Sequence, residues 1–92
     1  MEISFPRMAP QYDSACYTLV FPVQVDGRWI HCGITAEALE DHFGASSIRE
    51  ADLVDAFRAH RSAIEEAAAT LIEATHGVPV LLHSGVFRVC GG

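Results

Sequence analysis

The chain carries five histidines and three cysteines, side chains that can bind metals or serve in acid–base and nucleophilic catalysis. Their spacing matches none of the usual arrangements, because the sequence contains no Cys-x-x-Cys pair and no His-Glu-x-x-His motif. His31 and Cys32 are neighbours on a predicted strand, so their side chains point to opposite faces. We therefore predict no metal site, no cofactor and no catalytic residues.

The most suggestive polar group consists of His42, His60 and Arg61. These residues lie at the edge of, or within, the apolar stripes of two predicted helices, so the helices can share one polar pocket there. The alternative is a hydrogen-bonded network that joins the helices, with Asp41 or another acid opposite Arg61. The sequence leaves both interpretations open.

Trp29 and His31 form a second candidate site, on the face of a predicted hairpin opposite the core. If that face is uncovered, an exposed tryptophan indicates a contact site for another molecule. If the N-terminal segment or the C-terminal tail crosses the face, Trp29 belongs instead to a second small core. Both interpretations remain open at this point.

Charge and hydropathy exclude several classes of function. Twelve acidic residues oppose six arginines and no lysine, for a net charge of −6, so we predict no nucleic-acid partner and no anionic membrane surface. No apolar run approaches the roughly 18 residues of a membrane span, and the first residues do not resemble a signal peptide. An odd number of widely spaced cysteines predicts reduced thiols in a cytoplasmic protein.

The length of 92 residues fits one domain, and its first half has the pattern of a β-structure. Asp26 and Gly27 form the dipeptide best suited to a two-residue type I′ turn, which predicts a hairpin over residues 16–34. This turn pairs Phe21 with Cys32 and predicts that their face is the core. A short strand over 3–5 precedes the hairpin, and residues 8–14 are predicted to be a loop.

The second half has the pattern of helices followed by a strand. Thr35 predicts the start of a short helix over 36–43, which ends at Gly44. Ser47 and Glu50 match a capping box at the start of a long helix that reaches residue 76. A strand over 80–83 and a weaker one over 86–89 follow. We predict a single α+β domain over residues 1–92, with a small antiparallel sheet against one short and one long helix, in the order β-β-β-α-α-β(-β).

The predicted long helix bears on the oligomeric state. Residues 48–76 would extend about 43 Å as one straight helix, whereas a compact domain of this length is only about 32 Å across. Either the helix bends or breaks near residues 60–62, or its end packs on another chain. We therefore predict a homodimer.

Three segments carry a family resemblance: FPVQVDGR at 21–28, ITAEALEDHFGA at 34–45 and FRAHRSAI at 57–64. In this order and spacing they resemble the bacterial domain-of-unknown-function family 1488, over nearly the whole chain. The resemblance implies a compact α+β fold and a bacterial cytoplasmic protein. It implies no activity and no catalytic residues.

Two functions of different classes are compatible with these patterns. The first is a non-catalytic protein-interaction or accessory module that acts as a homo-oligomer, which we favour because no catalytic grouping is present. The alternative is a small-molecule-binding or enzymatic domain that uses His42, His60 and Arg61. A cavity beside those three residues would favour the second function, and a filled contact with paired charges the first.

Overall fold

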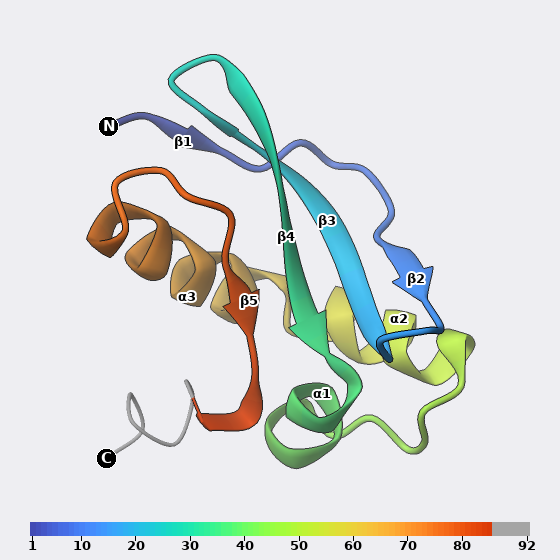
Figure 1. Cartoon of the computed structure of the whole chain (residues 1–92). Helices are drawn as coiled ribbons and strands as arrows, with labels where there is room; N and C mark the ends of the chain where they lie inside the picture. The colour runs from blue at the N-terminus through green and yellow to red at the C-terminus, as the bar shows by residue number, and fades with distance from the viewer. Residues whose placement is uncertain (86–92) are drawn as a thin grey trace.

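A computed structural model describes residues 1–85 of the chain (Figure 1). The α+β class and the order of the elements are confirmed, while the predicted strand over 86–89 lies outside the described residues. The elements in residues 1–85 are β1 (Ile3–Ser4), β2 (Gln11–Asp13), β3 (Thr18–Val25), β4 (Arg28–Thr35), α1 (Ala36–Phe43), α2 (Glu50–Ala59), α3 (Arg61–Ala74) and β5 (Leu81–Leu82).

The hairpin of β3 and β4 has the predicted turn and the predicted register. Asp26 and Gly27 have φ angles of 51° and 81°, the left-handed conformation that a type I′ turn requires. Phe21 pairs with Cys32, and both are at most 2% exposed. The face predicted to be the core is therefore the buried face of the hairpin.

The outer edge of β3 carries two short strands with a gap between them. β1 pairs with residues 24–25 and β2 with residues 18–20, so within residues 1–85 no strand pairs with residues 21–23 on this edge. Pro22 lies in the gap, where its missing N–H removes no bond of the sheet. The structure corrects the prediction of a loop over residues 8–14, because β2 forms there by pairing with β3.

β5 completes the sheet on the other side, and it runs parallel to β4. The sheet is therefore mixed, which corrects the prediction of a purely antiparallel one. The N–H of Gly33 donates to the carbonyl oxygen of Val80 at 3.0 Å. The parallel direction is possible because α1, α2 and α3 connect the end of β4 to the start of β5. This long connection returns the chain to the end of the sheet from which β4 starts.

α1 begins and ends as predicted, and α2 begins differently. The Thr35 hydroxyl accepts a hydrogen bond from the Ala38 N–H at 3.1 Å, and Gly44 ends α1 with a φ of 72°. At α2, the predicted capping box between Ser47 and Glu50 is replaced by another pair. The Ser47 hydroxyl donates to Asp52 at 2.6 Å, because Asp52, one turn into the helix, offers a charged acceptor.

The predicted long helix is two helices, α2 and α3, separated at His60. His60 has φ −121° and ψ 25°, outside the helical range. This corrects the prediction of one continuous helix and selects the alternative, a break near residues 60–62. The 14 residues of α3 extend about 21 Å, so α3 is short enough not to overhang the domain. The argument for a dimer from an overhanging helix therefore no longer applies.

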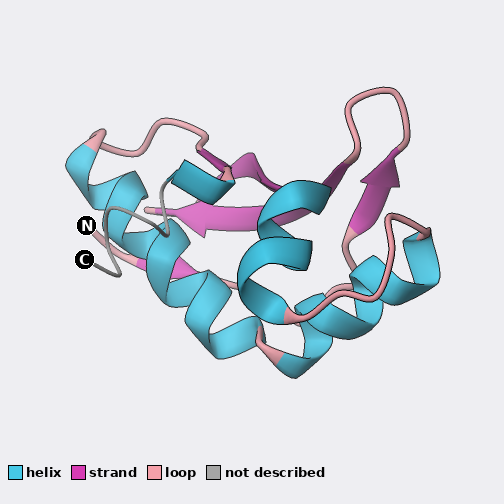
Figure 2. Cartoon of the chain, turned by 90° about the horizontal axis from the view of Figure 1, so that it is seen from below, coloured by secondary structure: helices cyan, strands magenta, loops and turns pink. Residues whose placement is uncertain are grey.

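The described elements form two layers, with α1, α2 and α3 on one face of the sheet (Figure 2). Alternate residues of β3 and β4 point into the core, where they meet the apolar sides of the helices. The rings of Phe21 and Phe57 lie 5.4 Å apart at the centre of this contact. The opposite face of the sheet carries no helix within residues 1–85.

Candidate functional site

Trp29 and His31 lie on the helix-free face of the sheet, where the register placed them. Trp29 is 54% exposed and sits opposite Gln24, while His31 is exposed and sits opposite Pro22. The sequence left open whether another segment covers Trp29. In the part of the chain that the structure describes, its side chain faces solvent.

β5 extends this face with a further apolar side chain. Leu81 is 51% exposed and pairs with Gly33, which has no side chain of its own. Val20, His31 and Leu81 line a shallow hollow of about 360 Å³ on the same face. We call the five residues Val20, Pro22, Trp29, His31 and Leu81 the outer sheet surface.

The carboxylates of the chain are concentrated on the other layer. α1, α2 and α3 carry three acidic residues each, nine of the twelve in the sequence. β3 and β4 carry none, and their charged residue is Arg28 beside the hairpin turn. The molecule therefore carries most of its negative charge on its helical side, whereas the five residues of the outer sheet surface carry no carboxylate and Asp13 of β2 lines the hollow beside them.

Arg61 binds the N-terminal segment and an acid on its own helix. Its guanidinium donates to the carbonyl oxygens of Pro6 at 2.9 Å and Met8 at 3.2 Å, and to the Glu65 carboxylate at 2.8 Å. It also lies 5.2 Å from the centre of the Phe57 ring. Glu65 is thus the acid opposite Arg61, whereas Asp41, the other candidate, accepts a hydrogen bond from Ser84 at 2.8 Å.

His42 and His60 lie on α1 and at the break between α2 and α3. The His60 ring packs on the Phe43 ring with centroids 5.3 Å apart, and His42 is on the exposed side of α1. A hollow of about 380 Å³ beside His60 is lined by Phe43, the loop after α1 and residues of α2. Of the three residues predicted to share a pocket, only His60 lines this hollow.

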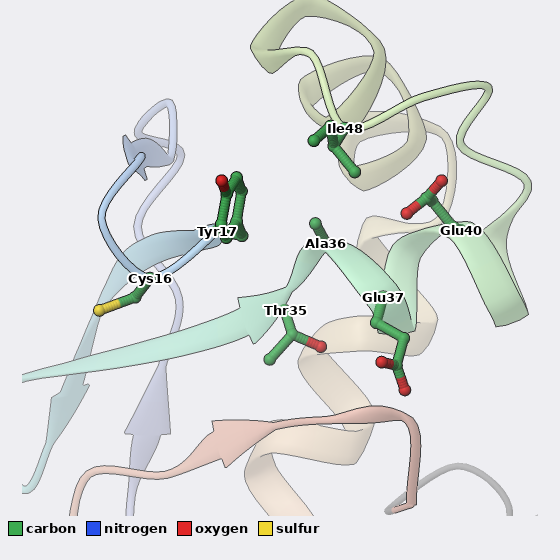
Figure 3. A pocket seen from close by; sticks show the side chains of 7 residues that line it. All are labelled: Cys16, Tyr17, Thr35, Ala36, Glu37, Glu40 and Ile48. Atoms are coloured by element: carbon green, nitrogen blue, oxygen red, sulfur yellow. The ribbon is translucent and has the colours of Figure 1, made fainter.

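A further hollow, which the sequence did not suggest, lies beside the start of α1 (Figure 3). It has a volume of about 360 Å³. Its lining comes from three separate parts of the chain: the turn before β3, the junction of β4 and α1, and the connection from α1 to α2. The lining residues are Cys16, Tyr17, Thr35, Ala36, Glu37, Glu40 and Ile48. We call this the α1 hollow.

The only sequence signal for the α1 hollow is a pair of apolar residues in polar surroundings. Tyr17 follows the turn-forming run Asp13-Ser14-Ala15-Cys16, and Ile48 stands between Ser47 and Arg49. Both are about half exposed. No motif links them, because they lie on segments 31 residues apart that only the fold brings together.

The structure also bears on metals and membranes. Within residues 1–85, no three His, Cys, Asp or Glu side chains gather closely enough to hold a metal ion. None of the described helices is both long and apolar enough to cross a membrane.

The sequence of residues 3–82 matches the family described as "Protein of unknown function (DUF1488)". The chain belongs to the DUF1488 family. This confirms the resemblance carried by the three segments at 21–28, 34–45 and 57–64.

A solved structure supports the same assignment. The DUF1488 chain is similar to a protein of unknown function from Shewanella loihica PV-4. That protein belongs to the same family, and its crystal structure is known. The two share 28% sequence identity and a TM-score of 0.73, over 90% of this chain and 97% of the other. Among curated proteins, none matches significantly. DUF1488 is a family of unknown function.

Proposed function

We propose that this DUF1488 chain is a non-catalytic protein-interaction module that forms a homodimer through the outer sheet surface. The observation that carries the proposal is the exposure of Trp29 (54%) and Leu81 (51%) on a sheet face with no described helix over it. Large apolar side chains that are left in water favour association, and tryptophan is enriched at the centres of protein interfaces.

The distribution of charge favours a second copy of the chain as the partner. Two copies that meet through their helical sides bring together surfaces that both carry a net negative charge, and these repel each other. Two copies that meet through the outer sheet surface bring together five side chains without a carboxylate, and Asp13 is the acidic residue that lines the hollow beside them. A two-fold axis through this surface lets the same residues contact each other from both sides.

The alternative function, a small-molecule or catalytic site of His42, His60 and Arg61, has less support. The Arg61 guanidinium already binds Pro6, Met8 and Glu65, which leaves it few donors for a ligand. The cytoplasmic location belongs to the same proposal, and the free thiols of Cys16 and Cys32 are compatible with a reducing compartment.

Light scattering coupled to size exclusion tests the dimer. For the parent protein we expect about twice the chain mass of 10.0 kDa when it is loaded at high micromolar concentration. The variant Trp29→Ser/Leu81→Ser should elute at the mass of one chain. Ile48→Ser is the matched control, because Ile48 is 47% exposed but lies away from the outer sheet surface.

Two outcomes would overturn the proposal. One is a parent protein with the mass of a single chain even at millimolar concentration. The other is a dimer that Trp29→Ser/Leu81→Ser leaves intact while circular dichroism shows the same fold in variant and parent.

A further inference from the structure

The α1 hollow has an aromatic wall that the backbone holds at some energetic cost. Tyr17 adopts a φ of 49°, a left-handed conformation that costs a non-glycine residue roughly 1 kcal/mol. Its ring is not buried in the core, since the residue is 54% exposed. The backbone is fixed on both sides, because the Tyr17 carbonyl accepts from the Ala36 N–H at 2.8 Å and the Cys16 carbonyl accepts from the Thr18 hydroxyl at 2.9 Å.

The other walls are aliphatic and acidic. Ile48 stands across from Tyr17 and is held by its carbonyl oxygen, which accepts a hydrogen bond from the Tyr12 hydroxyl at 3.3 Å. Figure 3 shows Tyr17, Ile48 and Glu40 arranged around Ala36, each from a different segment. Among the described residues that line the hollow there is no arginine or histidine, and both charged ones are glutamates.

These walls are unsuited to an anion, although the hollow adjoins a helix N-terminus. The Ala36 N–H is already bonded to Tyr17, and the Ala38 N–H to the Thr35 hydroxyl. Glu37 places a negative charge in the first turn of α1 and offsets the positive end of the helix dipole. An anionic ligand would therefore meet two carboxylates and find few free donors.

The same walls are complementary to an aliphatic chain that ends in a positive charge. A tyrosine face attracts a guanidinium group, an isoleucine packs against methylene groups, and a carboxylate pairs with the charge. We propose that the α1 hollow binds an arginine side chain on the surface of a protein partner. The hollow is open to solvent, so it admits a side chain that projects from a folded surface. This partner is additional to the second copy on the outer sheet surface.

The test is an NMR titration in which the capped tripeptide acetyl-Gly-Arg-Gly-amide is added to the 15N-labelled protein. The amide chemical shifts of the protein report binding. We expect saturable shifts at Tyr17, Glu40 and Ile48. The same tripeptide with citrulline, which has the shape of arginine without its charge, should give much smaller shifts. Methylguanidine, a guanidinium compound with a single positive charge, should bind less tightly than the tripeptide, because it lacks the methylene groups that pack against Ile48.

Two variants distinguish binding in the α1 hollow from the nonspecific attraction of a positive peptide to a negatively charged protein. Glu40→Gln should weaken binding by about two- to fivefold, the range of a partly exposed ion pair. Glu73→Gln is the matched control, because it removes the same charge from an exposed position on α3 and should leave the affinity unchanged.

Three results would overturn the proposal. The first is equal binding of the citrulline peptide, and the second is equal weakening by Glu40→Gln and Glu73→Gln. The third is loss of the dimer in Glu40→Gln, which would make the bound arginine one of a second copy of the chain.

Discussion

The guanidinium of Arg61 donates a hydrogen bond to the carbonyl oxygen of Pro6, 55 residues away in sequence, at 2.9 Å. A second bond from the same side chain reaches Met8 at 3.2 Å. The connection between β1 and β2 is thereby attached to the start of α3. Arg61 was a candidate for ligand binding in the sequence, and in the structure it holds two distant segments together.

Replacing Arg61 tests this attachment. We expect Arg61→Ala to lower the free energy of unfolding by about 2 kcal/mol, because two carbonyl acceptors lose a charged donor. Arg61→Lys should lie in between, since an ammonium group keeps the charge but cannot donate in the same fork. Urea denaturation measures both, with Arg58→Ala as the control at an exposed site. Equal effects of Arg61→Ala and Arg58→Ala would contradict the attachment.

Gly33 is expected to accept a side chain only at a cost in stability. A Cβ atom there would lie 2.8 Å from the Thr18 Cγ2 methyl and 3.3 Å from Leu81 Cδ1. We expect Gly33→Ala to destabilise the protein by about 1–3 kcal/mol, the usual range for overpacking.

A double variant shows whether the close contact with Thr18 is the cause. Thr18→Ser removes the methyl group and keeps the hydroxyl that bonds to the Cys16 carbonyl. In this background Gly33→Ala should cost less than in the parent protein. Thermal unfolding of the four proteins gives the comparison, and an undiminished cost in the Thr18→Ser background would refute the steric explanation.

Asp52 is expected to make stability depend on pH. The Ser47 hydroxyl bond lowers the pKa of Asp52 most, and Arg49 lowers it further by its charge and a hydrogen bond, while desolvation acts against both. Because the folded pKa lies below the unfolded value of about 3.9, this stabilisation is present above that value. It is lost as the pH falls through the folded pKa.

Ser47→Ala isolates the effect. The difference in free energy of unfolding between the parent and Ser47→Ala should be larger at neutral pH than in strong acid. An NMR titration should show a higher pKa for the Asp52 carboxyl in Ser47→Ala. Ser46→Ala, at the exposed neighbouring position, is the control. A difference that stays constant from neutral pH to strong acid would count against this account.

The two described cysteines are expected to differ in reactivity. Burial raises the pKa of the Cys32 thiol, and a bond from the Val80 backbone partly offsets this, whereas Cys16 is exposed. In a Cys90→Ser background, a thiol reagent should modify Cys16 quickly and Cys32 only when the protein unfolds. Mass spectrometry of the labelled peptides reads this out. Fast labelling of Cys32 in the native protein would show that the core opens readily.

The sequence predicted the hairpin well because its determinants are local. Asp26 and Gly27 specify the turn, and once the turn is known the alternation of side chains places Phe21 inside and Trp29 outside. The exposure of Trp29 was left open, because it depends on segments distant in sequence. The position of the four hairpin residues of the outer sheet surface was thus predicted, whereas their accessibility and the contribution of Leu81 were not.

The remaining differences come from tertiary contacts. β2 is defined by its pairing with β3, and its residues, with Asp13 among them, do not favour a strand by themselves. The break at His60 has no glycine or proline to indicate it, and the adjacent Arg61 binds a segment that precedes it by more than fifty residues. The α1 hollow was missed for the same reason, since Tyr17 and Ile48 meet only in the folded chain.

The parallel pairing of β5 with β4 determines how late in synthesis the sheet can be completed. The hairpin can close as soon as its own residues are made, but the partner of Ile34 is Leu82, 48 residues later. One edge of β4 therefore stays open while all three helices are synthesised. The free N–H and C=O groups of an unpaired strand edge can form hydrogen bonds with a strand of another chain, which leads to aggregation. Synthesis of β5 covers the part of that edge at Gly33 and Ile34, so we expect truncated products that lack β5 to aggregate more readily than the full chain.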